Sequence, residues 1–118
     1  MRYMLLIHQG STPLPGTDAW DALSQEQQQA VYAAYQQINE TPGVTAGERM
    51  SGPENATTVR VQDGRTLTTD GPFVEIKEAL GGYLFLDADD LDAAIELATK
   101  VPAASMGGAV EVRPMGGW

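Results

Sequence analysis

The chain contains a single histidine, His8, which is the first side chain to consider for proton transfer. It ends an apolar segment, and alternation along an expected strand places it on the same side as Leu6. If that side is the uncovered face of a sheet, His8 comes near Tyr83, Glu111 and Arg113 as a general acid or base. A histidine at a strand end can equally bond the backbone or meet solvent, so both interpretations stay open.

Two carboxylates, Asp70 and Glu78, are the other candidate catalytic residues, and both lie in the segment of residues 68–82. At the mouth of a cavity they would carry protons or anchor a polar ligand. Alternatively, Asp70 bonds N–H groups of its own turn, and Glu78 holds Lys77 or Arg113 in place.

Three cations, Arg60, Lys77 and Arg113, are candidate ligand-binding residues because their charged donors suit an anionic substrate. In an acidic chain such residues also balance neighbouring carboxylates. Glu111 lies two residues before Arg113, on the same face of an expected strand. That spacing fits an ion pair across a dimer interface as well as it fits a ligand contact.

The composition limits the partners. Sixteen acidic and seven basic residues give the 118-residue chain a formal net charge of −9, so neither nucleic acid nor an anionic membrane is an expected partner. The absence of cysteine excludes disulfides and thiolate chemistry. No phosphate-binding glycine loop, serine elbow or histidine-pair motif occurs, so no cofactor and no metal is predicted. The apolar stretch of residues 4–7 is too short for a secretion signal, which predicts a cytoplasmic protein, and the length predicts one domain over residues 1–118.

Periodicity and turn residues predict the elements. Ser24 with Gln27 forms a capping-box pattern at the start of a helix, Asp89 is the expected cap of a second helix, and Pro102 is expected to end it. Leu91, Ala94, Ile95, Ala98 and Val101 are its expected apolar stripe. The expected strands are residues 2–8, 44–50, 57–62, 65–69, 83–87 and 109–115, the expected helices are residues 24–40 and about 89–101, and the expected loops are residues 11–20 and 103–108.

The pair Asp63-Gly64 between two β-rich segments is a strong signal for a hairpin with a two-residue turn. With that loop length, Val59 faces Thr68 and Thr57 faces Asp70. The hairpin would therefore place Asp70 at its base, beside the sheet.

Without the hairpin, the order of elements is the split βαβ pattern of a ferredoxin-like α+β domain. The aliphatic side of each strand is assigned to the helices. The other side carries Tyr83 and Phe85, which form either an interface core or a stacking wall for an aromatic substrate. Such an uncovered face predicts a homodimer in which a second copy packs against it.

Several segments resemble a known family. The sequence DGPF at residues 70–73, the KE-x-x-GG pattern at residues 77–82, the MRYMLLI opening and the closing EVRPM together resemble the YCII-related family, in its DGPF branch. The resemblance implies a dimeric α/β barrel with ligand space between the sheets. By fold analogy with dehydrochlorinases and muconolactone isomerases, it also implies small aromatic or enol-type substrates. The chain departs from the family at residues 25–29, which read QEQQQ where several members have a histidine that pairs with an aspartate.

Three functions fit the sequence. The first is a dimeric small-molecule-binding protein or enzyme with a pocket between the sheets and acid/base chemistry. The second is a non-enzymatic accessory protein of transcription initiation, because genes of DGPF proteins tend to lie beside genes of extracytoplasmic-function sigma factors. The third is a dimer whose polar face is filled by its own side chains.

Overall fold

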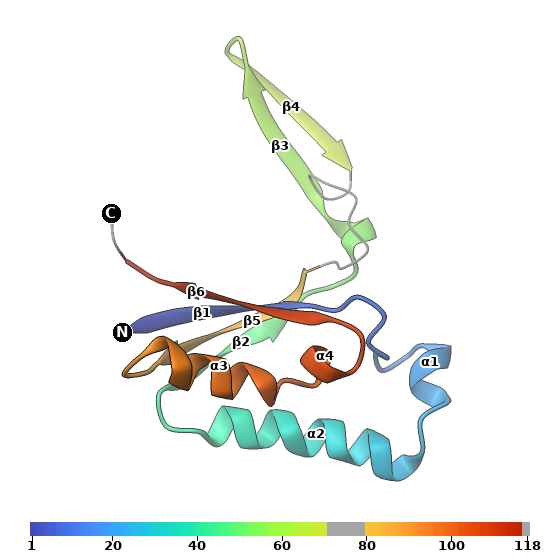
Figure 1. The fold of residues 1–118 in the computed structure, drawn as a ribbon. Coiled ribbons are helices and arrows are strands. Elements are labelled where there is room, and N and C mark those ends of the chain that lie inside the picture. Colours follow the sequence, from blue (N-terminus) through green and yellow to red (C-terminus); the bar gives the residue numbers. More distant parts are fainter. Residues whose placement is uncertain (71–79, 117–118) are drawn as a thin grey trace.

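The computed structural model describes residues 1–70 and 80–116. Its main sheet contains β1 (Arg2–His8), β2 (Val44–Arg49), β5 (Leu80–Asp87) and β6 (Ala109–Pro114) in the order β2-β5-β1-β6 (Figure 1). All neighbouring pairs are antiparallel. Consequently β1 and β2 are parallel with β5 between them, and β5 and β6 are parallel with β1 between them. This mixed α+β arrangement of two interleaved βαβ units agrees with the ferredoxin-like pattern expected from the sequence.

The helices α2 (Gln25–Glu40) and α3 (Leu91–Thr99) lie on one face of the main sheet (Figure 1). The predicted capping box begins α2: Ser24 Oγ accepts a hydrogen bond from the Gln27 N–H at 3.0 Å, and Gln27 Oε1 accepts one from the Ser24 N–H at 2.9 Å. Within the described part of the chain, no helix has both the length and the apolar character that a bilayer crossing requires.

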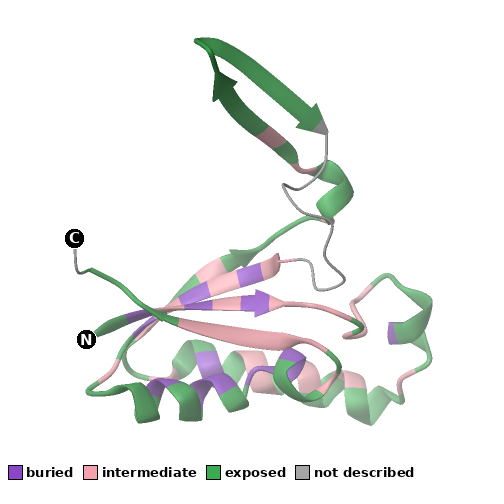
Figure 2. Cartoon of the chain, turned by 45° about the horizontal axis from the view of Figure 1, so that its top comes forward, coloured by how far each residue is buried: buried purple, intermediate pink, exposed green. Residues whose placement is uncertain are grey.

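The core fills the space between these helices and the inner face of the sheet (Figure 2). Alternate residues of β1 point into it, and Leu5 at its centre is 0% exposed. Val110 and Val112 pack against the same cluster. The assignment of the aliphatic side to the helices is therefore confirmed. The buried core residues from the strands and from α2 are Tyr3, Leu5, Ile7, Leu84, Leu86 and Ile38.

The start and end of α3 differ from the prediction. Asp90, not Asp89, is the N-cap, since its Oδ1 accepts a hydrogen bond from the Ala93 N–H at 2.9 Å. The helix ends at Thr99, and Pro102 begins the short helix α4 (Pro102–Ser105) instead of closing α3. Proline suits that first-turn position because its missing N–H has no partner there in any helix. Two segments expected to be loops therefore contain helical turns, α4 and α1 (Asp18–Asp21).

The apolar stripe of α3 also differs from the prediction. Leu91 and Ile95 are 48% and 46% exposed, whereas Leu97 is buried. The buried positions follow the helical spacing of i, i+3, i+4 and i+7, and two of them are alanines, whose small side chains let the helix approach the sheet closely. The larger Leu91 and Ile95 lie outside this contact. The buried positions are Ala94, Leu97 and Ala98 within α3 and Val101 just after its end.

The remaining strands, β3 (Thr57–Gln62) and β4 (Arg65–Asp70), form a separate two-stranded hairpin that stands away from the main sheet, after the short helix η1 (Pro53–Asn55) (Figure 1). Asp63 and Gly64 have φ angles of 51° and 73°, the positive values that a type I′ turn requires. The predicted register is confirmed, because Val59 pairs with Thr68 and Thr57 pairs with Asp70.

Candidate functional site

The main sheet has one face that none of the described helices covers, here called the open face. In β1 its residues alternate with the core positions, so that His8 shares the open face with Met4 and Leu6. Leu6 is the register partner of both Tyr83 and Glu111. The register thus brings four of the predicted site residues to one face: His8, Tyr83, Glu111 and Arg113.

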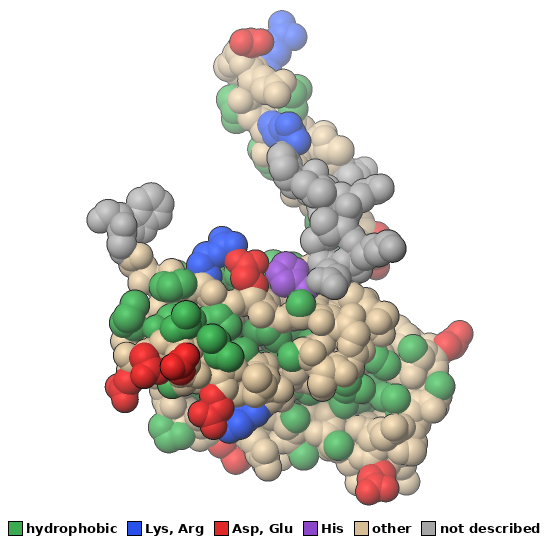
Figure 3. Space-filling view, in the orientation of Figure 1, with side chains coloured by type: hydrophobic (Ala, Val, Ile, Leu, Met, Phe, Trp, Pro, Cys, Tyr) green, Lys and Arg blue, Asp and Glu red, His purple; other side chains and the backbone are tan. Residues whose placement is uncertain are grey.

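Three of these residues form an ionic cluster. His8 Nε2 lies 3.5 Å from Glu111 Oε1, and Arg113 donates a hydrogen bond to Glu111 Oε2. Figure 3 shows the single histidine at the surface with acidic and basic side chains near it. The His8 side chain is 23% exposed. Glu111 therefore contacts a cation and an imidazole at once.

The charges in this cluster act on Glu111. The hydrogen bond from Arg113 is the main cause that lowers the pKa of Glu111 below its usual value, partial desolvation opposes it, and His8 adds a smaller lowering. An ionised carboxylate beside an imidazole favours one ring orientation and accepts a hydrogen bond from its N–H. The cluster can therefore hold and transfer a proton.

Aromatic rings line the open face beside the cluster. The rings of Tyr83 and Phe85 meet edge to face, with centroids 5.9 Å apart. The Arg2 guanidinium lies 4.8 Å from the centroid of the Phe85 ring, which is cation–π geometry. Sequence reasoning missed Arg2, although its even position in β1 places it on the same side as His8. The Arg2 guanidinium therefore covers part of the Phe85 ring. Tyr83, whose register partner is Leu6, lies nearer to the His8 end of β1 than Phe85 does.

The other predicted site residues lie on the hairpin or beyond it. Arg60 is in β3, where its register partner is Leu67. Asp70 ends β4. Lys77 and Glu78 lie outside the described residues, so their parts in the site stay predictions. Among the described residues, no group of three or more histidine, aspartate or glutamate side chains is placed to hold a metal ion.

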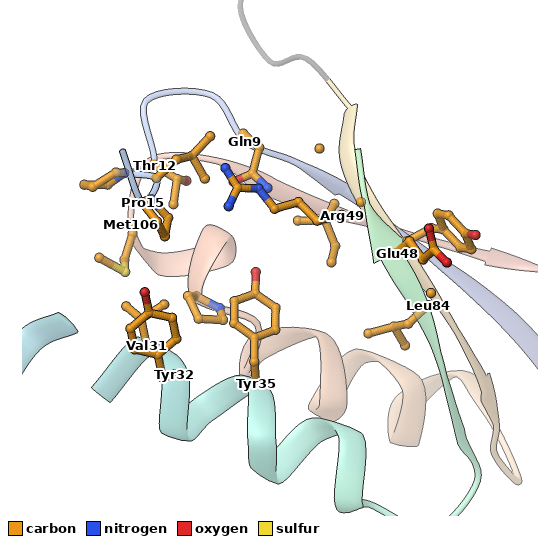
Figure 4. Close-up of a pocket in the computed structure, with 18 of the residues that line it drawn as sticks. Gln9, Thr12, Pro15, Val31, Tyr32, Tyr35, Glu48, Arg49, Leu84 and Met106 are labelled. Carbon is orange, nitrogen blue, oxygen red and sulfur yellow. The ribbon is translucent and has the colours of Figure 1, made fainter. Parts of the chain in front are cut away.

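A second feature lies on the other face of the same sheet. A cavity of about 290 Å³, here called the helix-side cavity, opens between α2, the end of β2 and the segment after β1 (Figure 4). Its walls are mainly apolar. The residues that line it include Arg49, Tyr35, Thr12, Gln9, Trp20 and Val31.

Arg49 and Tyr35 point into the helix-side cavity from opposite sides (Figure 4). Burial raises the pKa of Tyr35, and the nearby positive charge of Arg49 partly opposes that rise. Sequence reasoning counted neither Tyr35 nor Arg49 among the candidate site residues. The spacing of Tyr32 and Tyr35, one helical turn apart, was the signal in the sequence that two hydroxyls share one helix face.

The fold and the two faces define a small α+β protein with a split βαβ sheet that has an ionic cluster on one side and an apolar cavity on the other. The family model of the YCII-related domain matches residues 1–118, and the chain belongs to this family. An uncharacterized protein of Rhizobium meliloti (strain 1021) is similar, with 41% identity over 61 residues. The match covers 51% of this chain and 49% of the relative, so it spans about half the length of the curated protein.

Proposed function

We propose that this protein, as a member of the DGPF branch of the family, acts in the cytoplasm as a homodimer. In this proposal it binds a small aromatic or enol-type compound between two sheets and transfers a proton with His8. The observation that carries the proposal is the 3.5 Å contact between His8 Nε2 and Glu111 Oε1, on a sheet face that none of the described helices covers.

The open face favours a second copy as its cover. Met4, Leu6, Tyr83 and Phe85 are partly buried apolar side chains in the middle of a face that, in the single chain, meets solvent. A two-fold symmetric dimer brings the same patch of both copies together, so each copy buries its partner's apolar residues. In the proposed dimer, Arg113 of one copy lies opposite Glu111 of the other, so that the charges are complementary across the interface of the barrel that the family resemblance implies.

The chemistry follows from the cluster. His8 exchanges a proton with the ligand, and the Glu111 carboxylate orients the ring and stabilises its protonated form. A cover that excludes water strengthens each of these electrostatic contacts. In the proposed pocket Tyr83 stacks on the ligand. Asp70 and Glu78 act as further proton carriers at the mouth, and Arg60, Lys77 and Arg113 attract an anionic group.

The dimer is tested by light scattering at micromolar concentration, which should give twice the chain mass of 12.6 kDa. Leu6→Glu adds a charge beside Glu111 and should give a monomer with an unchanged circular dichroism spectrum. Ile95→Glu, on the outer side of α3, is the matched control and should stay dimeric. A monomeric wild type would overturn the covered-face argument.

The role of His8 is tested separately by NMR titration of its imidazole in the presence of a library of small aromatic and enol-type compounds. At least one compound should shift the His8 titration curve, and Glu111→Gln should reduce that shift. An imidazole that titrates identically with every compound would remove His8 from the proposed chemistry.

A second candidate function is an accessory role with an extracytoplasmic-function sigma factor, and the hairpin favours it. Val59 and Val61 lie on one face of β3 and are 60% and 68% exposed, an unusual position for two valines. An isolated two-stranded hairpin is marginally stable, so a protein partner would stabilise it. Purified sigma factor from a neighbouring gene should bind the wild type and lose affinity for Val61→Glu. Equal binding of both would argue against this role.

A further inference from the structure

We propose that the helix-side cavity is a second binding site, which takes a carboxylate with a compact apolar body and recognises its charged group through Arg49. This site lies across the sheet from His8. It does not depend on the proposed proton transfer or on the dimer.

A β-bulge directs Arg49 into the cavity. Val44 and Ala46 pair with Leu86 and Leu84 of β5, and regular alternation would then pair residue 48 with Gly82. The register shifts after Ala46, however, and Arg49 pairs with Gly82 instead. The one extra residue moves Arg49 from the open face to the helix side, a known use of bulges. Gly47 permits β2 to approach β5 closely at the bulge, because a Cβ at that position would collide with Tyr83.

Among the described residues, Arg49 has no carboxylate partner. In residues 1–70 and 80–116, both ion pairs are made by Glu111 on the opposite face. The neighbouring Glu48 also lines the cavity, but its carboxylate is directed away from the Arg49 guanidinium (Figure 4). In a chain with a net charge of −9, an arginine that faces a mainly apolar cavity is suited to an anionic ligand.

Two further polar side chains in the cavity are available to a ligand. The Tyr35 hydroxyl and the Gln9 amide face the same space as Arg49, and each can donate a hydrogen bond to a bound carboxylate (Figure 4). Thr12 also lines the cavity, but its Oγ1 is buried within the wall and is not presented to a ligand.

The walls determine the rest of the ligand. Trp20 and Tyr32 meet edge to face with ring centroids 5.4 Å apart, and Val31 and Met106 extend this apolar wall. The volume of about 290 Å³ is at the low end of the range of about 300–1,000 Å³ for small-molecule sites, which favours one ring or a short branched chain. One cation among apolar walls matches a monoanion better than a phosphate, whose second charge would have no partner.

The test uses benzoate as the charged probe and benzamide as its neutral isostere, with binding followed by amide and indole NMR shifts. Benzoate should bind the wild type saturably at millimolar concentration and shift the resonances of Trp20 and Tyr35. Arg49→Gln should weaken benzoate binding at least tenfold, or about 1.4 kcal/mol, and change benzamide binding less than twofold. Arg49→Lys should bind benzoate with an affinity between those of the wild type and Arg49→Gln. It keeps the positive charge but loses the planar guanidinium that can bind both carboxylate oxygens at once.

Arg65→Gln is the matched control, since it removes one positive charge at the hairpin turn and should change benzoate binding less than twofold. Tyr35→Phe tests the site independently. It should weaken benzoate binding severalfold, because it removes the hydroxyl donor, without unfolding the protein. The proposal is overturned if wild-type protein shows no saturable shifts. It is also overturned if Arg49→Gln binds benzoate as well as the wild type, or if the shifts map to the open face.

Discussion

At the scale of single residues, Glu111 contacts both His8 and Arg113 on the open face. Its ionisation links this cluster to the free energy of unfolding. The folded protein holds the pKa of Glu111 below the ordinary value of 4.5, chiefly through Arg113. A carboxyl whose pKa is lower when folded stabilises the protein above its unfolded pKa, and this contribution disappears as pH falls through the folded value.

Glu111→Gln should therefore be less stable than the wild type at pH 7, and the difference should begin to shrink near pH 4.5 and vanish once the pH is below the lowered pKa of folded Glu111. Urea unfolding of both proteins between neutral and acid pH measures the two free energies of unfolding. Arg113→Gln should show the same convergence, because it removes the main cause of the lowered pKa. A stability difference that stays constant down to acid pH would contradict this assignment.

The sequence predicts some of these residues and not others, for a physical reason. Strict alternation along β1 and β6 places His8, Glu111 and Arg113 on one face, and the structure agrees. The same alternation along β2 would place Arg49 on that face as well, because a bulge has no periodic signal. Gly47 is the only local indication, and a glycine in a strand can equally mark a tight bend or the close approach of another backbone.

At the scale of elements, the capping box should make a measurable contribution to α2. Ser24→Ala removes the acceptor for the Gln27 N–H and should lower the free energy of unfolding by about 1 kcal/mol. Ser24→Asp keeps an acceptor at the same position and should retain most of the stability. Urea unfolding at neutral pH checks both variants. Equal losses in the two variants would show that the cap hydrogen bond is not the cause.

The hairpin turn provides a second test at this scale. Gly64 has a φ of 73°, where an alanine side chain costs roughly 1 kcal/mol. Gly64→Ala should speed amide exchange in β3 and β4 roughly fivefold while leaving the exchange of β1 unchanged, because the core cluster of the described residues includes none from the hairpin. Gly64→Asn should preserve the protection, since asparagine tolerates this conformation. Uniform acceleration across both sheets would contradict an independent hairpin.

Elements with a local chemical signal are predictable in this chain, and elements defined by packing are not. The capping box and the Asp63-Gly64 turn depend on neighbouring residues, so their positions follow from the sequence. The cap of α3 could not be chosen among neighbouring aspartates without knowing where the backbone turns. The helix-side cavity likewise depends on how α2 approaches the sheet, which no single segment specifies.

At the scale of the whole molecule, the hairpin extends the chain beyond a compact domain. The radius of gyration is 16.2 Å, whereas a compact domain of similar length has about 13–14 Å. Small-angle scattering of Leu6→Glu, the variant designed to be monomeric, should therefore give about 16 Å. A value near 13 Å would mean that the hairpin folds back onto the sheet in solution.

The bulge in β2 also has a consequence for how this protein can change over generations. Val44, the residue of β2 that packs against the core, lies before the bulge, so losing one residue at position 47 would leave it in place and restore regular alternation after Ala46. Arg49 would then stand two residues after Ala46 and would still lie opposite Gly82, so the cavity beneath α2 would keep its cation. A single codon deletion thus removes the bulge without moving the charge to the other face of the sheet. Relatives that lack one residue at this point are therefore expected to keep a cation on the helix side of the sheet.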